Sequence, residues 1–266
     1  MKLKPVTAKS SVNLDDQHAT ARGPLKTKKE LERAAEKQVE RISDQQRVLY
    51  ADGRYALLIV LQGRDASGKD GTIRKVFTAV NPQGCTVASF KVPTELEQRH
   101  DFLWRVHAQV PARGMIGIFN RSHYEDVIVP RVRGSITKKE WTLRYDQIND
   151  FEGLLSENGT IILKFMLHVS RDEQKRRLLD RLNDETKNWK FRVGDLEDRA
   201  KWDDFTKAYE AAIRHTSTTW APWFIVPADD KDVRDWLVAR TIADALEKLD
   251  LRYPPPDPAV LKIRID

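Results

Sequence analysis

The sequence predicts an α/β fold: a parallel five-stranded sheet with helices on both faces and a helical lid. Five short apolar runs recur along the chain, and segments with helical periodicity separate them. Parallel strands need crossover connections of this kind, and helices on both faces bury such a sheet. The first apolar run passes directly into a glycine-rich loop, and two later segments are dense in arginine and lysine. The loop marks the expected site, and the basic segments are the expected lid.

The 266-residue chain is basic, with a formal net charge of +6 and a pI of about 9.3. This charge favours polyanionic partners: nucleic acid, phosphate-rich metabolites or an anionic membrane, although a basic surface can simply be solvated. The longest apolar run, Tyr55–Leu61, is far shorter than the ~20 residues that span a bilayer. Residues 1–25 lack the apolar core of a signal peptide, and Cys85 has no second cysteine to pair with. We therefore predict a cytoplasmic protein with a buried, unreactive thiol.

The first half of the chain contains three predicted strands. Residues 1–26 are polar and aperiodic, which predicts a flexible N-terminal arm, free or draped over the body. Thr27 and Glu30 have the spacing of a capping box at the start of a helix that reaches Leu49. The strands and helices expected next are Tyr55–Leu61 (strand), Gly68–Val80 (helix), Thr86–Phe90 (strand), Thr94–Val110 (helix) and Met115–Phe119 (strand).

The second half continues the alternation. Two more capping boxes, Thr137 with Glu140 and Ser170 with Glu173, begin helices. The remaining predicted elements are a helix to Leu155, a strand Thr160–Val169, a helix through Leu182, a helix Leu196–His215, a strand Trp223–Val226 and a helix Asp230–Leu249. We predict one domain over residues 27–253, with a lid around 121–146 and 171–200. Three prolines then begin an irregular tail, 254–266.

The segment between the first strand and the following helix has phosphate-loop spacing. Residues 63–69 read GRDASGK, which fits G-x-x-x-x-G-K in strand–loop–helix context. Glycines let backbone N–H groups converge on a phosphate, the helix N-terminus adds positive potential, and Lys69 can reach the next phosphate. The alternative is an ordinary glycine-rich turn. The predicted phosphate-binding residues here are Gly63, Ala66, Gly68, Lys69, Asp70, Gly71 and Thr72.

Two carboxylates interrupt this loop. Asp70 stands where Ser or Thr usually follows the lysine, and Asp65 lies within the loop. Carboxylates beside phosphates repel them unless a cation lies between, and Mg²⁺ typically takes one or two carboxylates plus phosphate oxygens. Asp65 is the favoured ligand of Mg²⁺ or Mn²⁺, whereas Asp70 is also explained by its place in the first helical turn.

The third strand ends in a second polar cluster, Asn120-Arg121-Ser122-His123-Tyr124-Glu125-Asp126. A strand beside a phosphate loop commonly delivers a carboxylate near the metal. Here Glu125 and Asp126 take that place, and the planar fork of Arg121 suits phosphate oxygens. The alternative is a helix start with acidic residues on the helix dipole. Arg131 and Arg133 follow, suited to a lid.

Residues 171–181, RDEQKRRLLDR, form the second basic segment, and Arg177 shares a helical face with Arg181. Such a helix is either a solvated face with i,i+4 ion pairs or a lid that brings cations over a polyanion. In the second case one arginine at a transferring phosphoryl group can raise the rate ~10³-fold.

Several motifs together resemble the polyphosphate kinase 2 family, the polyphosphate:nucleotide phosphotransferases. They are VLQGRDASGKDGT, NPQG, SFKVPT, DFLWR, FNRSHYEDV, YDQIN, HVSRDEQKRRL, WKF and APWFIVPADDK, in this order between about Val48 and Tyr253. The resemblance implies a P-loop kinase-like fold and Mg²⁺-dependent, reversible transfer of the terminal phosphoryl group of inorganic polyphosphate to a nucleotide. The NRSHYED segment is similar to the subgroup that acts on both AMP and ADP.

The resemblance also implies roles for individual residues. Asp65 and Lys69 would serve the loop, Arg121 the transferring phosphate, and Arg177 with Arg131 the lid. Asn120 departs from the aspartate that most members carry there, so Asp126 is the substitute metal ligand and Glu125 can face the nucleotide. The substrate-binding set is completed by Lys91, Asn120, Arg133 and Arg176.

Three other functions remain open. The enzyme can be restricted to nucleoside diphosphates, or it can be an ATP-dependent nucleotide kinase. The basic face can instead bind nucleic acid, although no helix-turn-helix, zinc finger or RNA-binding signature is present in the sequence. We expect polyphosphate and adenine or guanine nucleotides as partners, neither nucleic acid nor membrane, and a homo-oligomer.

Overall fold

The computed structural model describes residues 1–7, 10–21 and 27–265. Its centre is one five-stranded sheet in which every pairing is parallel, in the order β2-β3-β1-β4-β5. The strands are β1 (Ala56–Gln62), β2 (Cys85–Ser89), β3 (Ile116–Asn120), β4 (Thr160–His168) and β5 (Trp223–Pro227). The predicted five-stranded parallel sheet is confirmed.

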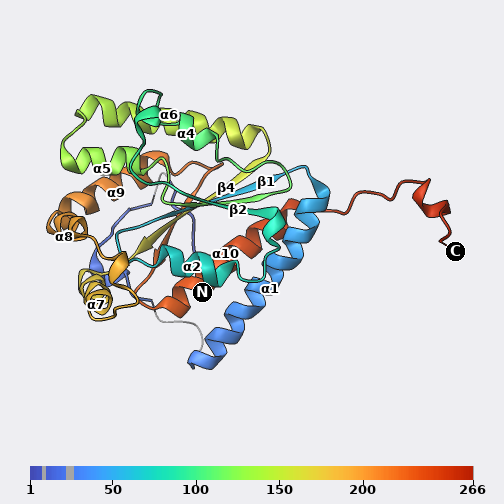
Figure 1. Cartoon of the computed structure of the whole chain (residues 1–266), viewed down its shortest axis with the longest axis horizontal. Helices are drawn as coiled ribbons and strands as arrows, with labels where there is room; N and C mark the ends of the chain where they lie inside the picture. The colour runs from blue at the N-terminus through green and yellow to red at the C-terminus, as the bar shows by residue number, and fades with distance from the viewer. Residues whose placement is uncertain (8–9, 22–26, 266) are drawn as a thin grey trace.

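Helices cover both faces of this sheet (Figure 1). One face carries α1 (Lys28–Asp52), α2 (Lys69–Val76) and α10 (Lys231–Leu246). The other carries α5 (Glu125–Arg133), α6 (Lys138–Glu157) and α9 (Trp202–Thr216). The remaining helices are α3 (Glu95–Gln98), α4 (Trp104–His107), α7 (Arg171–Leu182) and α8 (Val193–Ala200).

The central strand β1 shows why the sequence forms this sheet. All seven of its residues are buried, because side chains alternate between the two faces and both faces are covered. Leu57, Ile59 and Leu61 belong to the core under α1 and α10. Leu58 and Val60 belong to the core under α5, α6 and α9. A continuous apolar run is therefore what a doubly covered strand requires.

Two of the three predicted capping boxes are complete, those of Thr27 with Glu30 and of Thr137 with Glu140. The third is only half formed. Ser170 Oγ accepts from the Glu173 N–H at 3.2 Å, but the Ser170 N–H donates to Asp229 Oδ1 at 2.8 Å. The Glu173 carboxylate is therefore free to pair with Arg177.

The single helix predicted over 94–110 is wrong. The segment forms two short helices, α3 and α4, separated by a turn in which Asp101 Oδ1 accepts from the Leu103 N–H at 3.0 Å. This local bond gives the backbone an alternative to the helix. The helix predicted from Gly68 ends at Val76 instead of Val80, and that predicted over 196–215 is interrupted at Lys201, between α8 and α9.

The described part of the N-terminal arm is draped over the body. Val6, Leu14 and Ala19 are buried, the Val6 N–H donates to Trp223 O at 2.8 Å, and the Leu14 N–H donates to Glu210 Oε1 at 2.9 Å. At the other end, the segment after Pro254 leads away from the body (Figure 1). Among the described residues, no helix has the length and apolarity needed to cross a bilayer.

Candidate active site

The loop between β1 and α2, residues 63–69, has the backbone of a phosphate cradle. Its φ angles are +152° at Gly63, +62° at Ala66 and +104° at Gly68. A Cβ on Gly68 would lie 1.9 Å from Arg234 Nη1, so glycine is required there on two counts. Ala66 holds a left-handed conformation that a side chain disfavours, and such strain is concentrated at functional sites.

Lys69 is folded into this loop. Its side chain donates to Gly63 O at 2.7 Å and to Arg64 O at 3.2 Å, and the residue is only 8% exposed. Burial, with the nearby charge of Arg121, lowers the pKa of Lys69 to about 8. The loop thus holds a buried ammonium group against its own carbonyl oxygens. A phosphate oxygen would be a stronger partner for this cation.

Arg121 lies opposite, at the carboxyl end of β3. Its φ of +63° turns the chain sharply after the strand, and its N–H donates to Leu61 O at 3.1 Å. The guanidinium group forms ion pairs with Asp65 and, at 2.8 Å, with Glu125. These carboxylates, Glu125 foremost, raise the pKa of Arg121. Asp65, Lys69, Arg121 and Glu125 therefore meet at one place, as predicted from two separate motifs.

A small cavity adjoins this cluster. It is bounded by the loop, α5 and α9, and it is lined by Gly63, Arg64, Asp65, Arg121, Glu125, Val129, Gln174, Asp198, Arg199, Trp202, Phe205 and Tyr209. Charged side chains and aromatic rings are interleaved in this lining, with Arg64 stacked on Trp202.

Several of these residues, Arg64 and Trp202 above all, were not predicted from the sequence. Arg64 stacks on Trp202 with 3.8 Å between the guanidinium carbon and the ring centroid, and it donates to Trp202 O at 3.0 Å. Burial lowers the pKa of Arg64 to about 10. The place of Arg64 inside the loop motif could have identified it as a site residue. Nothing in the sequence could have identified Trp202, because it lies 138 residues further along the chain and reaches the loop only in the folded protein.

The predicted metal ligands lie apart. Asp126 accepts from Arg105 Nη2 at 2.9 Å and lines a separate groove, whereas Asp65 lines the cavity beside the loop. Asp70 accepts from Asn120 Nδ2 at 2.8 Å. Within the described ranges, no three His, Cys, Asp or Glu side chains are grouped as a metal site. Asp65 alone still fits Mg²⁺, which takes most of its remaining ligands from phosphates and water. The structure does not place Asp126 next to Asp65.

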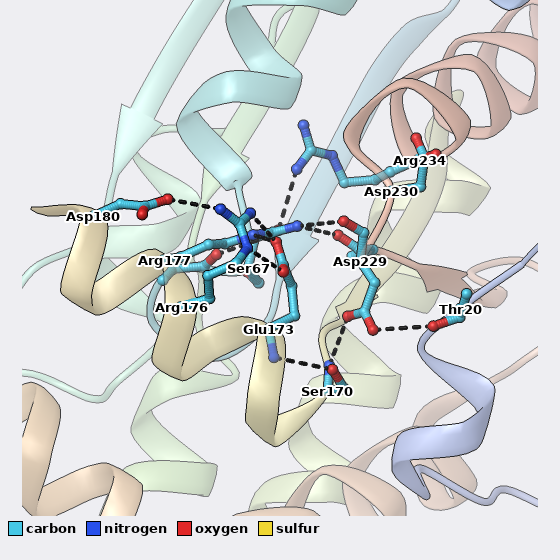
Figure 2. Close-up of polar contacts among 12 residues, drawn as sticks. Thr20, Ser67, Ser170, Glu173, Arg176, Arg177, Asp180, Asp229, Asp230 and Arg234 are labelled. Carbon is cyan, nitrogen blue, oxygen red and sulfur yellow. Dashed lines mark hydrogen bonds and ion pairs between the residues drawn. The ribbon is translucent and has the colours of Figure 1, made fainter. Parts of the chain in front are cut away.

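Arg177, the predicted lid cation, is buried beneath the loop (Figure 2). Its guanidinium group donates to the carbonyl oxygens of Ala66 and Ser67 on one side and of Ala228 and Asp229 on the other. It also pairs with Glu173 at 2.6 Å. In this structure Arg177 therefore joins the phosphate loop to the segment after β5. Its neighbour Arg176 is exposed and pairs with Glu173 and Asp180.

The other predicted residues have diverse surroundings. Thr72 is buried and donates to Asp235 Oδ1 at 2.9 Å, so its hydroxyl is engaged with α10. Arg131 lies 4.3 Å from the Trp141 ring centroid and donates to the Tyr145 hydroxyl. Arg133 reaches Asp198 at 3.4 Å, and Lys91 is exposed. Gly71 lies in the first turn of α2.

A buried network supports the turn that carries Arg121. Glu152 accepts from the Tyr124 hydroxyl at 2.9 Å, contacts His123 Nε2 at 3.2 Å and pairs with Lys164. Burial lowers the pKa of Lys164, and the charges of Lys164 and His123 outweigh burial to lower the pKa of Glu152. His123 is thus a packing and hydrogen-bonding residue of this network.

Taken together, the sheet order and the glycine-rich loop after the central strand give the protein a P-loop kinase-like fold. Comparison with known proteins supplies the family. Residues 25–254 match the family model described as Polyphosphate kinase 2. The chain belongs to the polyphosphate kinase 2 family.

Individual relatives support this family membership. The chain is 54% identical over 226 residues to an AMP/ADP-polyphosphate phosphotransferase of Meiothermus ruber, with 85% of each chain covered. It is 47% identical to an ADP-polyphosphate phosphotransferase of Rhodopseudomonas palustris, over 84% of this chain and 81% of that one. The crystal structure of polyphosphate kinase 2 from Arthrobacter aurescens TC1 superposes with a TM-score of 0.90 at 42% identity, covering 97% of this chain and 93% of that chain.

Proposed function

We propose that this protein is a polyphosphate:AMP/ADP phosphotransferase, which transfers the terminal phosphoryl group of inorganic polyphosphate to AMP and to ADP. The observation that carries the proposal is the convergence of Lys69, Arg121 and Asp65 at the loop after β1. The match to the polyphosphate kinase 2 model and the 54% identity to a relative named AMP/ADP-polyphosphate phosphotransferase support it.

In this reaction the bond between the terminal phosphorus and its bridging oxygen breaks, and a nucleotide phosphate oxygen forms the new bond. The loop N–H groups and Lys69 bind phosphate oxygens, and Arg121 faces the phosphoryl group that moves. Catalysis then depends on alignment and charge neutralisation. The acceptor oxygen is already ionised, so we assign no general base. Mg²⁺ or Mn²⁺, held by Asp65 and phosphate oxygens, would neutralise phosphate charge.

The acceptor range is the finer part of the proposal. Relatives with similar identities are named for AMP/ADP and for ADP alone. The test incubates purified protein with Mg²⁺, polyphosphate and either AMP or ADP, and quantifies the nucleotides by chromatography. ADP and ATP from AMP support the full proposal. Turnover of ADP alone indicates an enzyme restricted to diphosphates, and guanine nucleotides test the base.

A comparison of donors separates the proposed enzyme from an ATP-dependent nucleotide kinase. Polyphosphate should support the phosphorylation of AMP at a much higher rate than ATP does. Lys69→Ala should abolish turnover while the circular dichroism spectrum stays that of the parent. If ATP served and polyphosphate did not, the assignment of the donor would be wrong.

Three substitutions test the metal proposal. Asp65→Asn should raise the Mg²⁺ concentration needed for half-maximal activity, because it removes the carboxylate that is proposed to hold the ion. The Mg²⁺ requirements of Glu125→Gln and Asp126→Asn are then measured. They compare the carboxylate that contacts Arg121 with the one that contacts Arg105. An unchanged Mg²⁺ requirement in Asp65→Asn would contradict the role of Asp65. A raised requirement in Asp126→Asn would support the original assignment of Asp126.

The location and partners of the enzyme are also part of the proposal. We propose a cytoplasmic enzyme that forms a homo-oligomer and has neither nucleic acid nor membrane as a partner. Salt-sensitive binding to DNA without phosphoryl transfer would argue for the nucleic-acid alternative.

A further inference from the structure

A second, larger hollow lies away from the phosphate loop. This groove, of about 810 Å³, runs between the α3–α4 segment and α6. Its floor and walls include the apolar side chains of Pro93, Phe102, Leu143, Phe151 and Leu154. Leu143 is 52% exposed and Leu154 is 51% exposed. With Gln147 and Asp150 they form an unpartnered stripe on α6 at spacings of four, three and four residues.

The charge of the groove excludes the substrates. Its lining contains five carboxylates, those of Glu97, Asp101, Asp126, Glu140 and Asp150, against the guanidinium groups of Arg105 and Arg144. Hydrogen bonds from Thr94 and Thr137 lower the pKa values of Glu97 and Glu140, which keeps both ionised. The groove is therefore acidic in a protein whose net charge is +6. It repels polyphosphate and nucleotides, and it favours an occupant that is apolar and cationic.

The chain itself carries such a segment. Four apolar residues of the C-terminal tail are strongly exposed: Val260 at 58%, Leu261 at 71%, Ile263 at 65% and Ile265 at 95%. From Leu261 onward, Lys262 and Arg264 alternate with the apolar residues. Val260–Lys262 form a 3-10 turn in the described tail. Once this turn extends on docking, Leu261, Ile263 and Ile265 lie on the side opposite Lys262 and Arg264. One side suits the apolar floor of the groove, and the other suits its acidic rim.

The position of the tail favours a second copy over the same copy. The tail begins on the face of the sheet covered by α1 and α10, where the Arg252 N–H donates to Asp52 Oδ2 at 2.8 Å. The groove lies on the other face, beside α6. Pro254–Pro256 form a stiff spacer, and Figure 1 shows the segment beyond it leading away from the body. No described tail residue lines the groove of its own chain.

We propose that residues 257–265 dock into the α4–α6 groove of a second copy of this chain. The exchange gives each copy an apolar contact for its exposed tail and cations for its acidic groove. Two copies that exchange tails form a closed dimer, because the same pair of surfaces is used twice.

Association of the full chain, measured by analytical ultracentrifugation over a range of concentrations, tests the proposal. Leu261→Asp with Ile263→Asp should weaken association by ~10-fold or more, the effect of losing apolar anchors. Leu179→Asp with Leu182→Asp is the matched control, since it places the same two charges on exposed leucines of α7 outside both surfaces. A full chain that stays monomeric, or a dimer unaffected by the tail substitutions, would overturn the proposal.

Charge reversal identifies the contact. Lys262→Glu with Arg264→Glu should weaken association, and adding Gln147→Lys with Asp150→Lys in the groove should restore it. Neither groove residue caps a helix in the described structure, so the groove variant should fold. Mixing the tail variant with the groove variant should give a heterodimer, because each supplies the surface that the other lacks. Tail cross-linking to the groove of the same copy in a monomer would contradict docking to a second copy.

Discussion

The guanidinium carbon of Arg64 lies 3.8 Å from the centroid of the Trp202 ring, which joins the phosphate loop to the first residue of α9. Arg64 also donates to Trp202 O and to the Thr206 hydroxyl. Since Arg64 is a loop residue, the position of α9 and the shape of the loop are coupled. The cavity beside Asp65 is bounded by both.

Arg64→Ala should lower the free energy of unfolding by about 2 kcal/mol, because a buried stacking contact and hydrogen bonds are lost. It should also raise the KM for polyphosphate, since the loop loses its attachment to α9. Urea unfolding and steady-state kinetics measure the two effects. Arg240→Ala is the control. Arg240 lies 5.4 Å from the Trp236 ring centroid and does not line the cavity, so this variant should retain the parent KM.

Gly68→Ala should destabilise the protein by about 2 kcal/mol or more, because φ is +104° there and the new Cβ would meet Arg234 at 1.9 Å. Gly71→Ala offers a matched comparison three residues later. Gly71 is helical, its nearest neighbour would be 3.6 Å away, and alanine there should stabilise α2 by up to about 1 kcal/mol. Equal melting temperatures for the two variants would show that the steric argument is wrong.

Arg177→Ala should lower the free energy of unfolding by about 3 kcal/mol, because it leaves the carbonyl oxygens of the loop and of the segment after β5 without their donor. Arg176→Ala, on the exposed side of the same helix, should change it by less than about 0.5 kcal/mol. Urea unfolding of the two variants makes the comparison. A fully stable Arg177→Ala that had lost only turnover would favour the lid role expected from the family resemblance.

Binding of tripolyphosphate should weaken as the pH rises above about 8. The pKa of Lys69 in the free protein is about 8, so its positive charge is present below this pH and is lost above it. The protonated form binds phosphate, which makes the dissociation constant rise by up to about tenfold per pH unit above that pKa. Calorimetric titration from about pH 7.5 to about pH 9.5 measures the effect. Lys69→Arg should flatten the profile, because a guanidinium group keeps its proton.

The sequence by itself determined the sheet and the loop. The apolar run of β1 and the helical periodicity around it follow from burial on two faces, which depends on local pattern. The spacing of Gly63, Gly68 and Lys69 predicted the phosphate loop, which also depends on local pattern. Capping residues marked the start of α1 and α6. Asp65, Lys69, Arg121 and Glu125 were assigned to one site because a strand beside a phosphate loop commonly delivers a carboxylate near the metal.

Only the tertiary structure decided what each charged group contacts. Arg177 and Arg176 are adjacent in sequence, yet one is buried beneath the loop and the other is exposed, since their environments come from elements distant in the chain. Asp126 and Glu125 are likewise adjacent but point into different hollows. The split of residues 94–110 into α3 and α4 depended on a side chain that competes with the helix backbone. Periodicity records which face of an element is apolar, whereas ion pairs and cavities arise when separate elements pack.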